Sequence, residues 1–537
     1  MHNHRKMSLF SIVMMALSAL IGSGWLFGSW EASKLAGPAA ILSWALGGLI
    51  IGAIAYNYVE IGTMFPESGG MSKYAQYSHG SLLGFIAGWA NWVSLVTIIP
   101  IEAVATVQYM STWPWEWANW TRQFVAHGQV TTSGLMVVFV IIIIFTLINY
   151  GSITLMTHFT SLISLFKIGL PILTIIILTC SSFHPGNYGS NLQEFFPYGT
   201  APVLAATSVA GIIFSFNAFQ TVINMGSEIK KPERYIGLGI NISLLIAGVI
   251  YLLLQSAFIT SIPPKSLANG WQHITFDSPF ADLAILLGIN WLAILLYIDA
   301  FVSPFGTGVS FVASAARALA AMEDNGHLPH FLGKMNSKYR IPRIAMVVNA
   351  ILSMVMVALF RSWSLLATVL SAATLIAYLT GPVTAVALRK IGPQLFRPIK
   401  LKHLSVVAPL SFVLASLAIY WSMWPTTIEV IGIILLGLPI YLFYEQKNHF
   451  QQFRLHWQAS LWMIVYLIVI SLLSYGGSQE FGGQNWLHYP WDQLVIVVIS
   501  LGFYYWGSHS GVITADFEHA KKLNQKAKRL AQKDNAE

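Results

Sequence analysis

Long apolar runs repeat along almost the whole chain. A helix that crosses a bilayer needs about 20 consecutive, mostly apolar residues. Fourteen runs of this kind are present, of which the fourth and the ninth are short. They lie near residues 8–30, 38–64, 80–110, 133–150, 155–180, 202–224, 236–260, 288–316, 342–360, 364–388, 404–424, 427–444, 457–475 and 491–508. We therefore expect an all-α integral membrane protein with about 14 transmembrane helices.

The low share of charged residues agrees with this class. Charged side chains make up only 9% of the 537 residues, whereas a soluble protein carries about 25%. So few charges cannot solvate the surface of a globule of this size. The chain has a single cysteine, Cys180, which excludes an internal disulfide framework and gives no metal cluster.

The positions of lysine and arginine predict the orientation. We place the N-terminus in the cytoplasm and let each run cross once. The outer side then carries only Lys34, Arg122, Lys265 and Arg361 of the 29 basic residues, and Lys167 lies within a run. This asymmetry follows the positive-inside rule and also accounts for the net charge of +8, so no nucleic-acid partner is expected. We expect a multi-pass protein of the plasma (inner) membrane with cytoplasmic N- and C-termini.

Two of the runs are interrupted by residues that weaken a helix. Gly22, Ser23 and Gly24 break the first run, and "FSFNAFQ" (214–220) places polar groups within the sixth. Interrupted helices at matching positions of two halves indicate a binding site at the bilayer midplane. The N-terminal ends of half-helices favour an anion, and free carbonyls at their C-terminal ends favour a cation. A zwitterionic amino acid fits both at once.

Ionisable side chains within apolar runs are costly and are usually functional. Lys167 and Asp299 lie deepest. A buried lysine either pairs or loses its proton, so Lys167 is either a proton carrier or a static pin to backbone carbonyls, with Asp299 as a possible second member. Glu102 is either a functional group or a satisfied contact within the bundle. Glu60 lies near the cytoplasmic end of its run and is interpreted as structural.

Several motifs resemble those of the amino acid–polyamine–organocation superfamily of secondary transporters, in the same order and over residues 8–445. They are "IGSGWLF" (21–27), "FPESGGMSKYAQ" (65–76), "FSFNAFQTVINMGSEIKKPER" (214–234) and "HLPHFLGKMNSKYRIPRIA" (327–345). The two additional helices are similar to the fourteen-helix branch that holds bacterial aspartate–proton symporters. No HExxH or GxSxG motif is visible, so no enzyme is expected, and no cofactor or metal.

The resemblance implies a five-plus-five inverted-repeat fold of the LeuT type, with helices 1 and 6 discontinuous and alternating access. The transporter core would cover residues 1–445, with repeats at about 8–180 and 202–388. Residues 446–510 would add two transmembrane helices, and residues 511–537 a basic cytoplasmic tail.

The resemblance also implies a site. The substrate carboxylate would bind the N–H groups of Gly22, Ser23 and Gly24. The amino group would meet carbonyls near Leu20, Ile21, Phe214 and Ser215, with Phe216 as an aromatic cap. Asn217 and Ala218 would complete the pocket, and Ala218 stands where the family often has glycine. Gln220 replaces a frequent acidic residue, which favours neutral or acidic substrates over cationic ones. Lys167 matches the lysine that takes the place of a sodium ion in proton-coupled members.

The expected function is proton-coupled amino acid symport, with Lys167 and Asp299 in proton coupling and Glu102 and Gln220 as possible accessory residues. The expected partners are an amino acid, protons and the lipid bilayer. An exchanger of one amino acid for another, or for an amine, is the alternative, and a transporter-like sensor is a remote one. The sequence leaves open which amino acid binds, the stoichiometry, the oligomeric state and the role of the last two helices.

Overall fold

The computed structural model describes residues 7–67, 70–151, 153–217, 219–336, 342–447 and 452–534, and for residues 151–165 and 530–534 it describes the backbone alone. This part of the chain is almost entirely helical, with one small antiparallel hairpin of β1 (Val125–Ala126) and β2 (Gln129–Val130). The helices are α1 (Leu9–Leu20), α2 (Gly24–Ala36), α3 (Ala40–Met64), α4 (Gly70–His79), α5 (Ser81–Met110), α6 (Thr132–Gly151), α7 (Ile153–Ser181), α8 (Leu192–Phe195), α9 (Ala201–Val209), α10 (Ile212–Ser215), α11 (Phe219–Asn224), α12 (Pro232–Ser261), α13 (Pro279–Leu286), α14 (Asn290–Asp324), α15 (His330–Gly333), α16 (Arg343–Phe360), α17 (Trp363–Tyr378), α18 (Thr380–Ile391), α19 (Leu404–Tyr420), α20 (Thr426–Leu435), α21 (Leu438–Lys447), α22 (Phe453–Gly476), α23 (Trp491–His509) and α24 (Ala515–Asp534).

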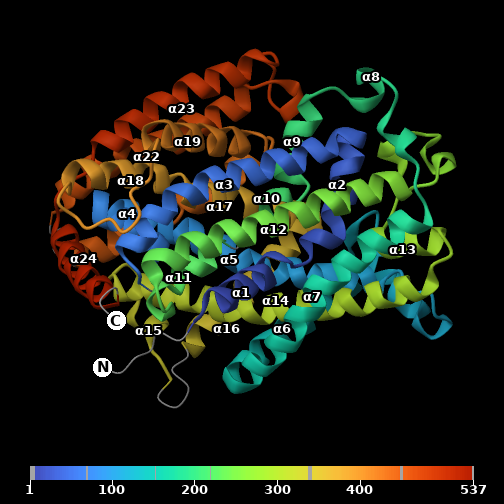
Figure 1. Cartoon of the computed structure of the whole chain (residues 1–537), viewed down its shortest axis with the longest axis horizontal. Coiled ribbons are helices and arrows are strands. Elements are labelled where there is room, and N and C mark those ends of the chain that lie inside the picture. The colour runs from blue at the N-terminus through green and yellow to red at the C-terminus, as the bar shows by residue number, and fades with distance from the viewer. Residues whose placement is uncertain are drawn as a thin grey trace.

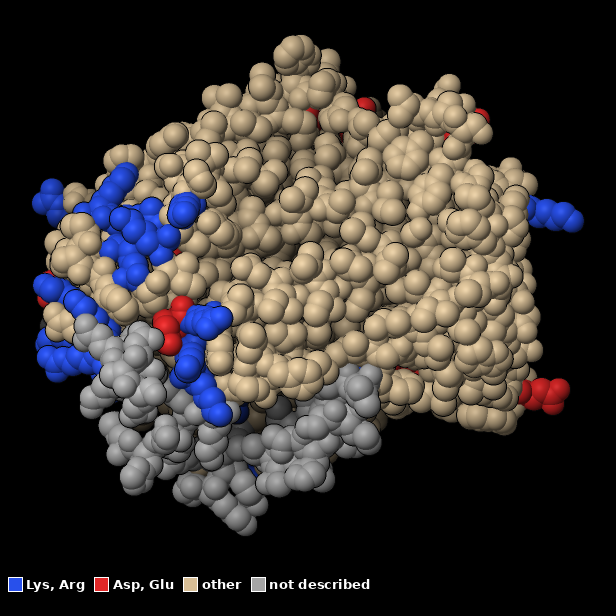
Figure 2. Space-filling view, viewed as in Figure 1, with Lys and Arg blue, Asp and Glu red and all other residues tan. Residues whose placement is uncertain are grey.

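The long helices run side by side along the long axis of the molecule, and both chain ends lie at the same end of it (Figure 1). Lysine and arginine gather at that end, and the broad middle of the visible face is free of charge (Figure 2). This is the pattern of a helix bundle whose uncharged belt faces lipid. We call the end that carries the termini the basic end.

Helix α5 forms the centre of the bundle. It packs against α14 and α17, and every residue except Trp89 is buried. A helix that is apolar on all sides has no face to offer to water, so it is most stable inside a bundle. Helices α3 and α12 pack against each other, and α1 packs against α12 and α7. The two interrupted segments are thereby held within one core.

Each of the fourteen predicted runs lies on a helix or on a broken pair of helices. By length and composition, nine helices of the described residues can cross a membrane, or up to ten if α9 and the segment Ile212–Asn224, bent by 46°, are one span. The smaller number has a physical cause, because breaks divide runs into short halves such as Leu9–Leu20. The count of fourteen stays a prediction.

The last two long helices, α22 and α23, pack against each other and against α19 and α20. The basic helix α24 then docks on the basic end. Its Asn524 amide donates to the carbonyls of Met64 (3.2 Å) and Phe396 (2.8 Å), and accepts from the Phe396 N–H (2.7 Å). Phe517 of the same helix is buried. The C-terminal segment is therefore part of the folded body at least as far as Asn524.

Glu60 of α3 anchors the segment that follows α18. Its carboxylate, which is 1% exposed, accepts from Arg389 Nε (2.8 Å) and Nη2 (2.5 Å) and from the Leu401 N–H (2.8 Å). Arg397 Nε lies 3.3 Å from the same carboxylate. Glu60 thus has the structural place expected of it, and it forms ion pairs with two arginines at once.

Removing this charge is expected to destabilise the protein. Glu60→Gln leaves Arg389 and Arg397 without their anion, and breaking a buried ion pair costs about 3 kcal/mol or more. The measurement is the thermal unfolding midpoint in detergent. Glu116→Gln, which removes an exposed carboxylate from the loop after α5, is the matched control. An equal midpoint in the two variants would contradict the structural role of Glu60.

Candidate functional site

The first break separates α1 from α2. Helix α1 ends at Leu20, Ile21 has left the helical region (φ −86°, ψ 83°), and α2 begins at Gly24. The Gly22 N–H donates to the Leu20 carbonyl at 3.1 Å, which closes a tight turn instead of a helical bond. Helix ends leave carbonyl and N–H groups without helical partners. Side chains from other helices bind these groups here.

Glu102 of α5 binds the N-terminal end of α2, where the chain leaves this break. Its carboxylate accepts from the Ser23 N–H at 3.2 Å (Oε1) and 3.1 Å (Oε2), and it is fully buried. A Cβ atom on residue 22 would lie 2.6 Å from Oε1, so only glycine permits this approach. A carboxylate of the chain itself therefore occupies the place that the family resemblance implies for the carboxylate of a substrate.

Lys167 of α7 binds the C-terminal end of α1, where the chain enters the break. Its ammonium donates to the Ser18 carbonyl at 2.7 Å and to Thr307 Oγ1 at 2.6 Å, and the residue is 1% exposed. The Ser18 carbonyl is in the last turn of α1, where no following turn supplies an N–H donor. Lys167 thus links α1, α7 and α14 at one point.

Asp299 of α14 is the third buried ionisable group. Its Oδ1 accepts from Ser303 Oγ at 2.6 Å, one turn further along the same helix. The charges of Glu102 and Asp299 both act on Lys167. Two acids and one base are neutral together only when one additional proton is bound, and a buried net charge is costly. The three groups thus place two acids and one base in the core of the bundle.

The second break lies between α9 and α11. Gly211 has a positive φ of 77°, which favours glycine, and the short helix α10 follows it and ends at Ser215. The Phe216 and Asn217 N–H groups donate to the carbonyls of Ile213 (3.2 Å) and Phe214 (3.1 Å) in tightened turns. Ala218 lies outside the described residues. The unwound stretch thus begins within the "FSFNAFQ" motif.

Asn217 joins a wall of uncharged polar groups. Its Nδ2 donates to Ser94 Oγ (3.2 Å) and Thr374 Oγ1 (3.1 Å). Its Oδ1 accepts from the Tyr378 hydroxyl (2.6 Å), and Gln220 Nε2 lies 3.4 Å from the same oxygen. The partners of Asn217 come from α5, α11 and α17, so the wall joins three helices that are far apart in the sequence.

Tyr251 of α12 connects the two breaks. Its hydroxyl lies 2.8 Å from the Leu20 carbonyl and 3.1 Å from the Ser215 carbonyl, and it can donate its one proton to either of them. These are two of the carbonyls that the resemblance assigns to the amino group of a substrate. Nothing in the sequence singles out Tyr251, because it is one of 21 tyrosines and lies in no motif.

The aromatic residues of the second break point to different neighbours. Phe214 packs against Trp363 (ring centroids 6.1 Å apart), which stacks on Phe27 at 4.9 Å. The Trp363 Nε1–H also donates to Ser23 Oγ at 2.9 Å. Phe216 packs instead against Tyr251, at 5.2 Å. Phe214 is thus the aromatic ring beside the first break, and Trp363 is a second residue that the sequence did not reveal.

Two cavities meet at this site. A small one of about 10 Å³, with space for roughly one water molecule, lies between the breaks. It is lined by Ala19, Gly22, Ile98, Glu102, Phe214, Asn217, Thr307 and Phe311. A vestibule of about 410 Å³ includes Lys73, Gln220, Phe311 and Arg317 in its lining. Phe311 lines both cavities, so the two lie next to each other at this residue.

The structure brings most of the predicted site residues together. Contacts connect Leu20, Gly22, Ser23, Gly24, Phe214, Ser215, Asn217, Glu102 and Lys167 around the breaks, and Ile21 is buried among them. Gln220 lies on the vestibule wall, and Asp299 interacts through its charge with Lys167. Phe216 packs against Tyr251 of α12. The roles assigned to these residues stay predictions.

Comparison with known proteins identifies the family. The family model described as amino acid permease matches residues 7–469. The glutamate/serine transporter AimA of Bacillus subtilis (strain 168) is 50% identical over 521 residues, which cover 97% of this chain and 96% of that protein. The aspartate-proton symporter of the same organism is 34% identical over 522 residues, 96% of this chain and 98% of the relative.

A methylthioribose transporter of the same organism is 25% identical over 459 residues, 83% of this chain and 94% of that protein. The family and these relatives are membrane transporters and not enzymes, which confirms the expectation drawn from the motifs. With its two broken helices inside a multi-pass helical bundle, this chain belongs to the amino acid permease family.

Proposed function

We propose that the protein is a proton-coupled amino acid symporter and that its substrate binds between the two helix breaks. The observation that carries the proposal is the carboxylate of Glu102 on the Ser23 N–H. It supports the view that this turn of backbone accepts a carboxylate in a buried place. Backbone N–H groups at the start of a helix are suited to an anion by their dipoles.

The substrate class follows from the polar wall and from the relatives. The names of the two most similar relatives above are those of a glutamate/serine transporter and an aspartate-proton symporter. Ser94, Thr374 and Asn217 offer hydroxyl and amide groups to a short polar side chain. We infer a small neutral or an acidic amino acid, with its ammonium group at the carbonyls of Leu20 and Ser215, which the Tyr251 hydroxyl now binds.

Proton coupling follows from competition between two carboxylates. The substrate carboxylate can reach the Ser23 N–H only when Glu102 leaves it. A buried carboxylate that has lost its donors is costly as an anion, so Glu102 binds a proton as the substrate enters. One carboxylate anion then still faces the Ser23 N–H, because that of the substrate replaces that of Glu102, and one proton moves with each substrate. Lys167 and Asp299 complete the set of groups that exchange this proton.

The transport cycle follows from the arrangement of the cavities. We propose fourteen spans, inverted repeats at about 8–180 and 202–388, and a plasma-membrane protein whose basic end is cytoplasmic. The vestibule then opens to the cytoplasm, and the aromatic cluster of Phe27, Trp363 and Phe214 closes the outer side. This state would be an inward-facing one, and movement of the breaks against α5 and α14 would expose the site outward.

The direct test is uptake of each of the twenty amino acids into proteoliposomes, with and without an inward proton gradient. We expect serine, glutamate or aspartate to accumulate only when the gradient is present. Liposomes preloaded with amino acid separate symport from exchange, because an exchanger takes up substrate only into preloaded vesicles. Uptake into empty vesicles that ignores the gradient would contradict the proposal.

Replacing Glu102 by glutamine is expected to separate binding from coupling. The amide retains an acceptor oxygen for the Ser23 N–H but cannot take up the proton. We expect gradient-driven accumulation to fall at least tenfold, about 1.4 kcal/mol, while exchange into preloaded vesicles persists. Glu480→Gln, which removes an exposed carboxylate after α22, is the control. Unchanged gradient-driven accumulation in Glu102→Gln would remove Glu102 from the coupling mechanism.

A further inference from the structure

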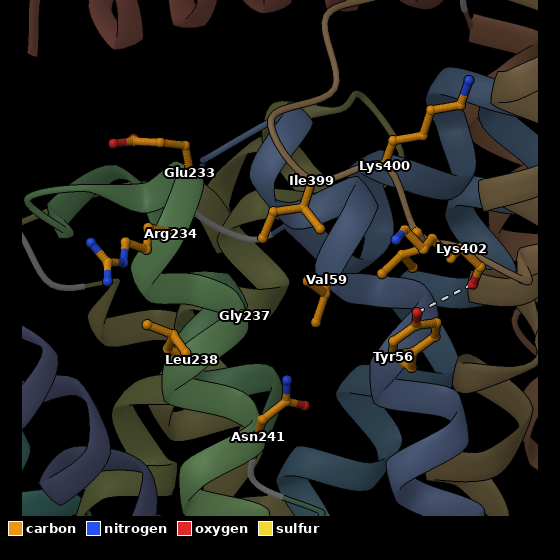
Figure 3. Close-up of a pocket in the computed structure, with 11 residues that line it drawn as sticks. Tyr56, Val59, Glu233, Arg234, Gly237, Leu238, Asn241, Ile399, Lys400 and Lys402 are labelled. Atoms are coloured by element: carbon orange, nitrogen blue, oxygen red, sulfur yellow. Dashed lines mark hydrogen bonds between the residues drawn. The ribbon is translucent and has the colours of Figure 1, made fainter. Parts of the chain in front are cut away.

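A groove of about 530 Å³ lies at the basic end, away from the site between the breaks. Figure 3 shows α3, with Tyr56 and Val59, on one side and α12, with Leu238 and Asn241, on the other. The segment that includes residues 399–402 passes over its end. The Tyr56 hydroxyl donates to the Lys402 carbonyl at 3.2 Å and ties this segment to α3. The groove therefore has three fixed walls.

Three basic side chains surround the groove. Arg234, Lys400 and Lys402 are exposed and take part in no ion pair within the described residues. Glu233, the one acidic residue of the lining, makes no ion pair there either, and the lining keeps a net positive charge. The neighbouring Arg389, by contrast, is paired with Glu60. The groove can thus accept an anion, since no acidic residue in the described part of the chain forms an ion pair with these cations.

The rest of the groove is apolar and continues along the lipid-facing side of α12. Leu238, Leu245 and Val249 are 36%, 71% and 49% exposed and follow one another at helical spacing on that face. At the floor of the groove, Gly237 lets α12 approach α3 closely, since a Cβ atom there would lie 3.0 Å from Val59 Cγ1. An anion that binds here therefore has an apolar surface directly beside it.

Asn241 lies on this same face and is exposed. Its amide makes no hydrogen bond with the described part of the chain. A polar amide that faces hydrocarbon without a partner is costly. A ligand with ester or hydroxyl oxygens just below its anionic group would satisfy it. From the basic end, α12 presents Arg234, Leu238, Asn241 and then Leu245 and Val249. Below the amide the surface is apolar, as acyl chains follow the glycerol esters of a phospholipid.

We propose that this groove binds one anionic phospholipid from the leaflet at the basic end. Its phosphate lies among Arg234, Lys400 and Lys402, its glycerol backbone passes Leu238 with ester oxygens near Asn241, and an acyl chain follows Leu245 and Val249. The placement in that leaflet rests on the membrane orientation proposed above. Free phosphate shares the headgroup chemistry but makes no use of the apolar column, so a lipid is the occupant that fits the whole groove.

The test is native mass spectrometry of the full chain released from nanodiscs of phosphatidylglycerol and phosphatidylcholine. We expect one phosphatidylglycerol to remain bound to the wild type. Each basic side chain near an anionic lipid contributes about fivefold in affinity, so Arg234→Gln/Lys400→Gln/Lys402→Gln should weaken retention roughly a hundredfold. The control Lys522→Gln/Lys526→Gln/Lys528→Gln removes the same charge from exposed positions of α24 and should retain the lipid.

A second variant keeps all three basic residues but blocks the groove between them and Asn241. Leu238→Trp places a large ring on an exposed position of the groove and should reduce retention at least tenfold without unfolding the protein. The proposal is overturned if the groove variants retain phosphatidylglycerol as the wild type does. Equal retention of phosphatidylcholine and phosphatidylglycerol would also overturn the proposal, because the groove would then not select an anionic headgroup. Displacement of the lipid by inorganic phosphate would overturn it too, because the apolar column would then contribute no affinity.

Discussion

Lys167→Met is expected to abolish gradient-driven uptake and to leave any residual uptake independent of pH. The Lys167 ammonium holds the Ser18 carbonyl and Thr307 Oγ1 at 2.7 and 2.6 Å. Its removal frees the last turn of α1 from α14 and takes a buried positive charge out of the core that also holds Glu102 and Asp299. Loss of one partner of a buried charged group costs about 3–5 kcal/mol. A fall in uptake of tenfold or more and a lower thermal midpoint should therefore occur together.

Lys167→Arg keeps the positive charge of the side chain but prevents this residue from releasing a proton. Arginine keeps a permanent positive charge because its pKa lies above 12 in general. We expect this variant to fold and to bind substrate, but to show no increase of uptake with a proton gradient. Lys265→Met, in the loop after α12, is the matched lysine control and should behave as the wild type. pH-dependent uptake at the wild-type level in Lys167→Met would disprove the coupling role.

Gly24→Ala is expected to have the second large effect. A Cβ atom on residue 24 would overlap Ser215 Oγ and lie 3.2 Å from Ser215 Cβ and 3.4 Å from Phe214 Cδ1. The start of α2 and the end of α10 meet at this point without space for a methyl group. Overpacking of this kind costs about 1–3 kcal/mol, which corresponds to a loss of transport of roughly ten- to a hundredfold.

The measurement is uptake together with the thermal stabilisation of the purified protein by substrate. Gly169→Ala is the matched control, since a Cβ atom there would meet nothing within 4 Å, two residues from Lys167 on α7. Gly24→Ala/Ser215→Gly should regain part of the activity, because the overlapping side chain is absent. An active single variant, or a double variant that is no better than the single one, would contradict close contact between the breaks.

Much of the architecture could be predicted because hydrophobicity and helix-breaking residues are local properties. Each predicted run lies on a helix, and the first break falls at Ile21–Ser23, one residue from the predicted Gly22–Gly24. The second break was placed at 214–220, and α10 ends there at Ser215. The additional bend at Gly211 was not predicted, because a single glycine in an apolar run is compatible with a continuous helix.

The sequence by itself determined which segments face lipid, where two helices lose their hydrogen bonds, and which buried charges need partners. Only the tertiary structure decided what binds the freed groups. Ser23 is bound by Glu102, 79 residues away, and by Trp363, 340 residues away. Tyr251 reaches the Leu20 carbonyl across 231 residues. Periodicity and composition report on neighbours along the chain, whereas these contacts depend on how helices distant in sequence pack together.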